Sequence, residues 1–170
     1  HQRGVLVLHG SSVAIGEKGV VVVGEKMAGK SSLVMGLLAC ENQLISDDVT
    51  GVVFDRVTAE VLPGFASIKL WPDVLQVLGI DPTCYPVLHA ETEKRHYFPE
   101  KKSCCGTRIK LEFIVVLSQS DLIRTEELTG REKLLSILNS HYMSRYDEVL
   151  SADEQKKVFL ECVKIARQVR

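Results

Sequence analysis

The most informative segment of this sequence reads Gly24-Glu25-Lys26-Met27-Ala28-Gly29-Lys30-Ser31. It matches Gly-x-x-x-x-Gly-Lys-[Ser/Thr] at every fixed position. Glycines let the backbone curl so that successive amides point inward, and such a concavity binds phosphate oxygens. The β-branched run Val20–Val23 before the loop indicates a buried strand. Apolar residues at helical spacing after it indicate a helix from Lys30 to about Cys40. Strand, loop and helix together make a chance match in a glycine turn rare.

In a loop of this kind, Lys30 reaches the β- and γ-phosphates of a nucleotide, and the Ser31 hydroxyl holds Mg²⁺. The helix that begins near Lys30 adds the positive end of its dipole. ATP and Mg²⁺ are therefore the expected cofactors. The residues expected to bind them are Gly24, Glu25, Lys26, Met27, Ala28, Gly29, Lys30, Ser31 and Ser32.

A pair of carboxylates, Asp47-Asp48, follows the short apolar strand Leu44–Ile45. Beside a phosphate loop, one carboxylate can help to hold Mg²⁺ while the other accepts a proton from an attacking hydroxyl. Two close carboxylates also raise each other's proton affinity, which suits a base. The alternative is a solvated turn, where Asp is common. The residues alone do not tell which of the two is the base.

The rest of the chain mixes short strands with a few helices. A helix opens at Pro72 and closes at Gly79, and two more close the chain, each with a capping box. No apolar periodicity appears between Asp81 and Arg108, which predicts a long functional or mobile loop. The further strands are expected at Val5–Leu8, Val13–Ile15, Val52–Phe54, Glu60–Leu62 and Leu111–Leu117, and the capping boxes at Thr129-x-x-Glu132 and Ser151-x-x-Glu154.

Composition excludes several classes of protein. The 170 residues fit one domain, and a net charge of −1 argues against bulk nucleic-acid binding. No apolar run approaches the ~18 residues of a membrane span. Five cysteines without a Cys-x-x-Cys pair favour a reducing compartment, and a cytoplasmic location is expected. The chain begins with His1 and not with Met, as expected of a fragment that lacks N-terminal residues.

Three segments resemble the catalytic domain of HPr kinase/phosphorylase, in the same order and at compatible spacing. They are Leu8-His9-Gly10, the loop Gly24–Ser31, and Leu44-Ile45-Ser46-Asp47-Asp48. The segment Pro63–Asp73 further resembles the smaller HPr-kinase-like proteins, some of which phosphorylate a terminal serine of a lasso-peptide precursor. The resemblance implies an α/β fold of the HPr kinase/phosphoenolpyruvate carboxykinase type, a P-loop domain with a mixed central sheet. Residues 1–170 would form this single nucleotide-binding catalytic domain.

The resemblance also implies roles for individual residues. Lys30 and Ser31 would bind nucleotide and Mg²⁺, Asp47 would be the base, and Asp48 would bind magnesium or substrate. His9 would lie near the phosphates, although a strand-end histidine bonded to backbone is the alternative.

One departure from the bifunctional enzymes affects the predicted activity. After the aspartate pair they carry an acidic, glycine-containing segment that is tied to phosphorolysis. Here the comparable stretch reads Ala66-Ser67-Ile68-Lys69-Leu70-Trp71, with no acid and no Gly-x-Gly. This predicts a kinase without the reverse activity and an acceptor other than HPr. Lys69 would bring positive charge toward the transferred phosphate, whereas Trp71 is expected to be a packing residue rather than an adenine platform.

Basic residues gather further along, and they predict a clamp for phosphate or an acidic peptide. Lys94 and Arg95 are the chosen pair, with a solvated loop as the alternative. The neighbouring Cys104-Cys105 is expected to be neither redox-active nor a metal site. The full cluster is Lys94, Arg95, Lys101, Lys102, Arg108 and Lys110.

The function predicted is an ATP-dependent kinase that acts on a serine hydroxyl of a peptide or protein, with a lasso-peptide precursor as one candidate. Two alternatives stay open. A nucleotide-dependent switch would read guanine with Asn-Lys-x-Asp, of which Ser118-Gln119-Ser120-Asp121 keeps only the Asp. A small-molecule kinase acting on free serine is the other. The expected partner is the substrate peptide or protein, with a homo-oligomer implied by the resemblance, and neither nucleic acid nor membrane is expected.

Overall fold

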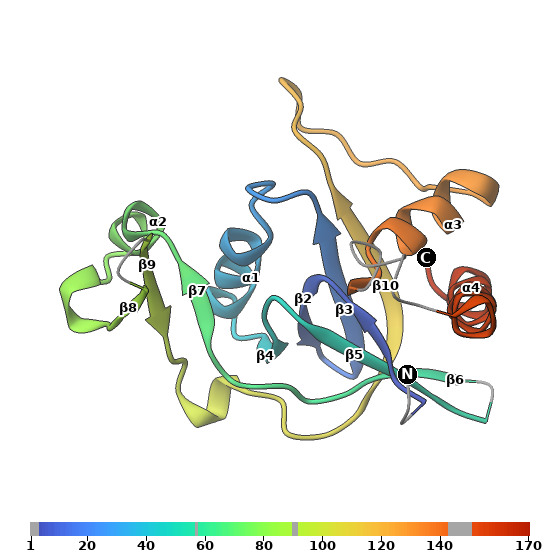
Figure 1. Ribbon diagram of the computed structural model, residues 1–170. Coiled ribbons are helices and arrows are strands. Elements are labelled where there is room, and N and C mark those ends of the chain that lie inside the picture. The colour runs from blue at the N-terminus through green and yellow to red at the C-terminus, as the bar shows by residue number, and fades with distance from the viewer. Residues whose placement is uncertain (1–3, 57, 90–91, 143–150) are drawn as a thin grey trace.

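The computed structural model describes residues 4–56, 58–89, 92–142 and 151–170. Its main sheet has seven strands in the order β1-β5-β6-β10-β3-β2-β4 (Figure 1). Strands β10 and β3 pair in parallel, while the other neighbouring strands of this sheet pair antiparallel, so the predicted α/β class with a mixed sheet is confirmed. The strands are β1 Leu6–Leu8, β2 Gly10–Ile15, β3 Lys18–Gly24, β4 Gln43–Ser46, β5 Thr50–Asp55, β6 Thr58–Val61 and β10 Ile109–Leu117.

The central strand β3 is buried on both faces, as its run of valines predicts. Val21 and Val23 belong to one apolar cluster, together with Cys162 and Ile165 from the last helix. Val20 and Val22 belong to a second cluster with Val34 of the helix after the loop, among others. In Figure 1, accordingly, α1 (Lys30–Ala39) lies on one side of the sheet, and α3 (Gly130–Asn139) and α4 (Ala152–Gln168) lie on the other.

The sheet topology brings four distant segments to one edge. Helix α1 crosses from β3 to β4, and both strands run antiparallel to β2 between them. The ends of β3 and β4 therefore meet at the edge where β2 begins, with Gly10 opposite Val23. Strand β10 ends there too, since Leu117 lies opposite Gly24. The loop Gly24–Ser31, the aspartate pair and His9 all follow or precede these strand ends.

The stretch predicted to be one long loop is instead partly folded. A second, three-stranded sheet has the order β7-β9-β8, and β9 pairs Leu70 with Arg95. The prediction failed because β9 reads Thr-Glu-Lys-Arg-His-Tyr, which has no apolar alternation to mark it as a strand. The elements of this part are β7 Ile68–Leu70, α2 Pro72–Val77, η1 Pro82–Cys84, β8 Val87–His89, β9 Thr92–Tyr97 and η2 Lys101–Ser103.

The two capping predictions differ in outcome. Ser151 and Glu154 form the predicted box, each side chain bonding the other's backbone amide. Thr129 occupies the N-cap of α3 but makes no side-chain capping bond, so this box was wrong. Gly130 follows it with a φ of 52°, outside the helical region. In α4, Val158 and Cys162 are buried, whereas Phe159 is 46% exposed.

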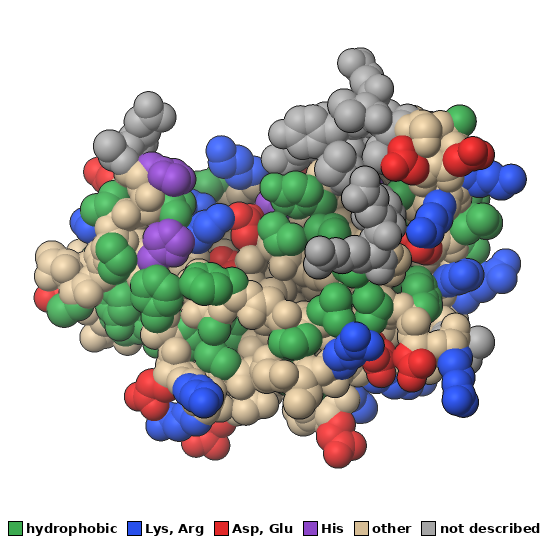
Figure 2. Space-filling model, turned by 60° about the horizontal axis from the view of Figure 1, so that its bottom comes forward, with side chains coloured by type: hydrophobic (Ala, Val, Ile, Leu, Met, Phe, Trp, Pro, Cys, Tyr) green, Lys and Arg blue, Asp and Glu red, His purple; other side chains and the backbone are tan. Residues whose placement is uncertain are grey.

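Two surface features bear on partners. On the face drawn in Figure 2, acidic and basic side chains are interspersed around the margin rather than segregated. Within the described ranges, none of the helices combines the length and apolar character that crossing a membrane requires.

Candidate active site

The loop between β3 and α1 needs its two fixed glycines for different reasons. Gly24 has a φ of 148°, and a Cβ there would lie 2.6 Å from the carbonyl oxygen of Leu117. Gly29 adopts the left-handed conformation, with φ 93°, and is the N-cap of α1. Residues that carry a side chain rarely adopt such backbone angles. The loop therefore curls back on itself and leads directly into the N-terminus of a ten-residue helix.

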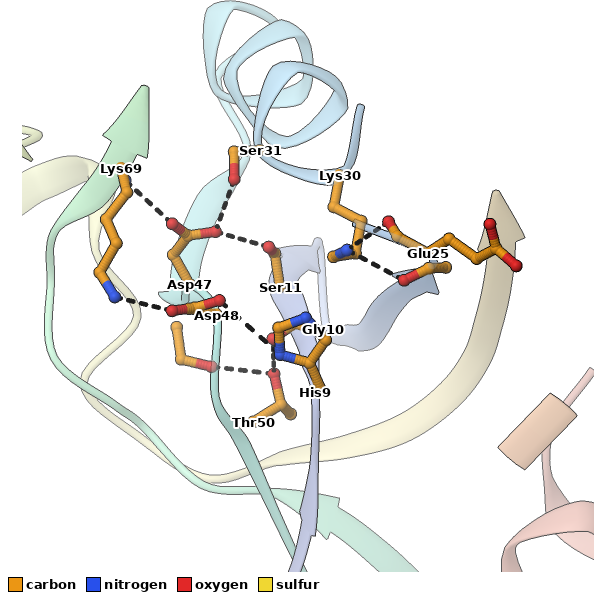
Figure 3. A network of polar contacts seen from close by, with 12 residues as sticks. His9, Gly10, Ser11, Glu25, Lys30, Ser31, Asp47, Asp48, Thr50 and Lys69 are labelled. Carbon is orange, nitrogen blue, oxygen red and sulfur yellow. Dashed lines mark hydrogen bonds and ion pairs between the residues drawn. The ribbon is translucent and has the colours of Figure 1, made fainter. Parts of the chain in front are cut away.

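Lys30 lies across this loop (Figure 3). Its Nζ donates to the carbonyl oxygens of Gly24, at 3.0 Å, and Glu25, at 2.9 Å. The ammonium group is thereby held over the curled backbone, beside the N-terminus of α1. An ammonium group in this place would neutralise the charge of a phosphate bound at the loop.

Asp47 is a carboxylate with both oxygens engaged. Its Oδ1 accepts from Ser11 Oγ at 2.5 Å and from Ser31 Oγ at 3.2 Å. Its Oδ2 accepts from the backbone amide of Lys69 at 3.0 Å. The Asp47 side chain thus joins β2, the first turn of α1 and β7. Sequence reasoning missed Ser11, because a serine in a strand gives no signal of its partner.

Asp48 has a different environment. Its backbone is left-handed, with φ 69°, a conformation that aspartate tolerates better than most residues. Its Oδ2 accepts from Lys69 Nζ at 2.7 Å, and its Oδ1 lies 3.7 Å from His9 Nδ1. The side chain is 39% exposed. In Figure 3 both carboxylates contact Lys69, Asp47 through the backbone amide and Asp48 through Nζ, whereas their other partners differ.

The charges around Asp48 control its protonation. Partial burial acts to raise the pKa of this carboxyl, but the hydrogen bond and charge of Lys69, and then the charges of His9 and Lys94, outweigh it. The net result is a pKa below the ordinary aspartate value. Asp48 is therefore an ionised carboxylate at neutral pH, open to solvent on one side.

A buried polar layer holds the aspartate pair from beneath. Ser12 Oγ and Ser46 Oγ lie 2.7 Å apart, and Ser46 Oγ is 3.1 Å from Thr50 Oγ1. Thr50 Oγ1 also donates to the carbonyl oxygen of Gly10 at 2.9 Å. Because these hydroxyls join β2, β4 and β5 inside the fold, they fix the strand end from which Asp47 and Asp48 project.

The site opens into a cavity of about 540 Å³. One wall comes from the loop and α1. The opposite wall comes from the three-stranded sheet β7-β9-β8, called the small sheet below, and from α2. A second cavity, of about 890 Å³, lies on the other flank of the loop, between it and the ends of β10 and α3. The first is lined by His9, Lys26, Met27, Gly29, Lys30, Ser31, Ser32, Asp48, Lys69, Leu70, Trp71, Asp73, Val74, Leu88, Lys94 and Tyr142.

Most of the predicted site residues meet around these two cavities. The first cavity gathers His9, Asp48, Lys69 and Lys94 with the loop residues, while Gly24, Glu25 and Ala28 line the second. Trp71, predicted to be a packing residue, is partly buried and also lines the first cavity. Tyr142 lines it too, and no sequence pattern indicated this.

The predicted basic clamp is not assembled as a unit. Arg95 is outside both cavity linings, and its Nη1 lies 3.4 Å from the carbonyl oxygen of Tyr85. Alternate residues of a strand point to opposite faces, so Lys94 and Arg95 cannot act as neighbours. Lys102 and Lys110 pair instead with Glu100 and Glu112. Of the predicted cluster, Lys94 lines the first cavity.

Comparison with known proteins agrees with the resemblance that the three sequence motifs indicate. No family model matches the chain. The HPr kinase/phosphorylases of Stenotrophomonas maltophilia strains K279a and R551-3 are each 35% identical to it over 75 residues, which is 44% of this chain. The matched segment spans 23% of each relative's length. A structure of the HPr(Ser) kinase/phosphatase from Coxiella burnetii has a TM-score of 0.47 and 17% identity, covering 74% of this chain and 73% of that one.

Over the matched segment the chain is HPr-kinase-like, as the resemblance in the sequence predicted. The likeness in sequence covers less than half of the chain.

Proposed function

We propose that this protein is a Mg²⁺-dependent kinase that transfers the γ-phosphoryl group of ATP to a serine hydroxyl of a peptide or protein. One observation carries the proposal: a phosphate-binding loop and the ionised carboxylate of Asp48 line the same cavity. A loop alone would bind a nucleotide. A carboxylate facing the loop across open space adds a group that can accept a proton from a hydroxyl. The likeness to HPr kinase/phosphorylases favours transfer to a hydroxyl over a switch.

The loop has the features that ATP requires. The curled backbone between Gly24 and Gly29 and the N-terminus of α1 supply amides and a positive dipole end. Lys30 Nζ bonds two neutral carbonyl oxygens. Bonds to phosphate oxygens are charge-assisted and stronger, so the ammonium would exchange onto the β- and γ-phosphates when nucleotide binds.

The oxygen donors beside the loop suit Mg²⁺. Ser31 Oγ and Asp47 Oδ1 lie 3.2 Å apart at the edge of the loop. Mg²⁺ in proteins is commonly held by one or two such oxygens together with phosphate oxygens and water. Among the described residues, no group of three or more His, Cys, Asp or Glu could hold a metal, so nucleotide phosphates would complete this site. When bound, Mg²⁺ neutralises charge on the β- and γ-phosphates.

This geometry favours a division of roles opposite to the one that the resemblance implies. Asp47 accepts from Ser31 and would serve the metal side, whereas Asp48 lines the cavity. In the proposed transfer, the acceptor hydroxyl gives its proton to the Asp48 carboxylate as its oxygen bonds to the γ-phosphorus. The bond from that phosphorus to the bridging oxygen breaks, ADP leaves, and Asp48 releases the proton to solvent. His9 and Lys69 hold the carboxylate in place.

The segment in β7 supports a kinase without efficient reversal. Lys69 binds Asp48 through Nζ and Asp47 through its backbone amide. It occupies the place where the bifunctional relatives carry an acidic, glycine-containing segment. Supplying a phosphopeptide with excess inorganic phosphate should give little pyrophosphate; efficient pyrophosphate release would refute this part of the proposal.

The function is tested by incubating the protein with ATP, Mg²⁺ and a set of serine peptides, including candidate lasso-peptide precursors, and searching for phosphoserine by mass spectrometry. We expect phosphoserine in the wild-type reaction and not in a reaction without Mg²⁺. If ATP binds but neither a peptide nor a protein acceptor is ever phosphorylated, the proposed activity is wrong.

A further inference from the structure

The wall of the first cavity that faces the loop contains residues without a role in nucleotide binding. We call it the acceptor wall. It combines apolar surface with two ammonium groups and the carboxylate of Asp73. Its residues are Lys69, Leu70, Trp71, Asp73, Val74, Leu88 and Lys94.

The second cavity offers the nucleoside of ATP a place away from the acceptor wall. ATP whose γ-phosphate lay beside Ser31 and Asp48 would have that phosphate in the first cavity. Its phosphate chain would run along the loop past Glu25 and Lys26, and its nucleoside would reach the second cavity, which these two residues line. Trp71 is outside that lining. The acceptor wall is therefore available for whatever carries the hydroxyl.

Lys94 is the distinctive charge of this wall. Its Nζ lies 5.3 Å from the centroid of the Trp71 ring, a cation–π contact that holds the side chain in place. Lys69 on the neighbouring strand is neutralised by Asp48 at 2.7 Å. Among the described residues no ion pair is found for Lys94, although its charge reaches Asp48 and helps to lower the pKa of that carboxyl. The cavity thus holds an ordered ammonium group that the described part of the chain leaves without a carboxylate.

We propose that Lys94, ordered by Trp71, determines acceptor specificity by binding a carboxylate that the acceptor carries close to its hydroxyl. This deepens the proposed kinase function and rests on it. A carboxylate on Lys94 would leave the hydroxyl end of the acceptor directed toward Asp48, and Leu70, Val74 and Leu88 would contact the apolar stem between the two groups.

Three sources of such a carboxylate exist: an acidic side chain beside the serine, the terminus of a peptide that ends in serine, and free serine. They are separated by comparing initial rates on matched acceptors with ATP and Mg²⁺. The first pair of peptides differs only by Glu or Gln next to the serine, with both ends blocked. The second pair ends in serine as the free acid or the amide. Free serine and its amide form the third pair.

The enzymes compared are wild type, Lys94→Gln, Lys94→Arg and Lys101→Gln. Lys101 is an exposed residue outside the cavity lining, so its variant matches the loss of one charge without touching the site. We expect wild type to prefer the acid over the neutral member of at least one pair by ~10-fold or more in kcat/KM, as a partly desolvated ion pair allows. Lys94→Gln should lose most of that preference, and the other two variants should keep it. Equal rates on both members of every pair, or a preference unchanged in Lys94→Gln, would overturn the proposal while leaving the kinase intact.

Binding can be followed without turnover, because Trp71 is the one tryptophan in the sequence. Its fluorescence should change when the preferred acid acceptor is added to protein already holding Mg²⁺ and a non-hydrolysable ATP analogue, and the analogue alone should change it little. A response to nucleotide alone would make Trp71 an adenine platform and overturn the inference. If wild type binds ATP but phosphorylates none of these acceptors, the proposed function itself fails, and the inference fails with it.

Discussion

The two walls of the first cavity are built in contrasting ways. One wall, formed by the loop Gly24–Ser31 and α1, is called the loop wall and acts through its backbone. Its left-handed glycines and the N-terminus of α1 create a surface for anions. The acceptor wall acts through side chains, above all Lys69, Trp71 and Lys94, which stand on or next to short strands of the small sheet. A binding surface made of backbone amides requires particular residue types at a fixed spacing. A surface made of side chains requires only a suitable side chain at the correct strand position, so the sequence of the acceptor wall is free to vary while that of the loop wall is not.

The aspartate pair connects the two walls. Asp47 reaches Ser31 in the loop wall and the amide of Lys69 in the acceptor wall. Asp48 reaches Nζ of Lys69 and faces the space between the walls. Substitutions at these neighbouring residues should therefore fail in different ways, and that difference provides the sharpest test of the comparison.

The largest effect is expected for Asp48→Asn. Loss of the proton acceptor should lower turnover by ~10²–10⁴-fold. ATP affinity should change little, because Asp48 lies outside the loop. Steady-state kinetics together with calorimetric titration of ATP and Mg²⁺ measure both quantities.

Asp47→Asn is the matched comparison, since it removes the same charge one residue away. It should raise the Mg²⁺ concentration needed for half-maximal rate, an effect that Asp48→Asn should not show. Near-wild-type turnover in both variants would mean that the pair is only a turn.

Lys30→Ala tests the loop wall alone. It removes the ammonium group over the loop and should weaken ATP binding and lower the rate by ~10²–10³-fold, as loss of one charge-stabilising donor typically does. The thermal unfolding transition should stay close to that of wild type, because Lys30 bonds only loop carbonyls and opens a partly exposed turn of helix. Unchanged ATP affinity in a folded Lys30→Ala protein would remove the loop from the proposed site.

The difference between a wall built from backbone and a wall built from side chains explains how much of the molecule could be predicted from its sequence. The loop, strand β3 and helix α1 were predictable because glycine spacing, a valine run and helical periodicity each report a backbone state. Strand β9 was not, because its charged residues carry no apolar alternation, and β8 was not, because three residues are too few to show a periodicity. The aspartate pair was found by its position after a strand, but its partners Ser11 and Lys69 depend on tertiary register, which a single sequence does not display.

Lys69→Gln tests the electrostatic link between the walls. Lys69 lowers the pKa of Asp48, so without it that pKa should rise. A base works only when deprotonated, and the acid limb of the pH–rate profile should therefore move to higher pH in Lys69→Gln. The Lys101→Gln variant should leave the limb in place. An unshifted limb in Lys69→Gln would show that Asp48 is not the group that titrates.

The same shift has a consequence for stability with a definite sign. A carboxyl whose pKa is lower in the folded state stabilises the fold at pH values above its ordinary pKa of 3.8. This contribution is lost as pH falls through the folded-state value. Denaturant unfolding at neutral and acid pH should therefore show a smaller pH dependence in Lys69→Gln than in wild type.

The smallest effects are expected from glycine substitutions that change packing but not charge. A Cβ at Gly10 would lie 2.6 Å from the carbonyl oxygen of Val22, so Gly10→Ala should destabilise the fold by about 1–3 kcal/mol. Gly36, in α1, has open space around its Cβ position, and Gly36→Ala should stabilise by about 0.5–1 kcal/mol. Chemical denaturation measures both. Equal effects of the two substitutions would contradict the tight approach of β2 to β3 beneath the loop.

In the proposed reaction, phosphate bound at the loop wall passes to a hydroxyl held against Asp48. This transfer is tested most directly by following the γ-phosphoryl group itself, with ATP labelled at that position, Mg²⁺ and the best serine acceptor. We expect the label to appear mainly in phosphoserine with wild type, and we expect Asp48→Asn, although it still binds ATP, to lose this transfer. Label that passes only to inorganic phosphate in wild type, or that reaches serine equally fast with Asp48→Asn, would contradict it.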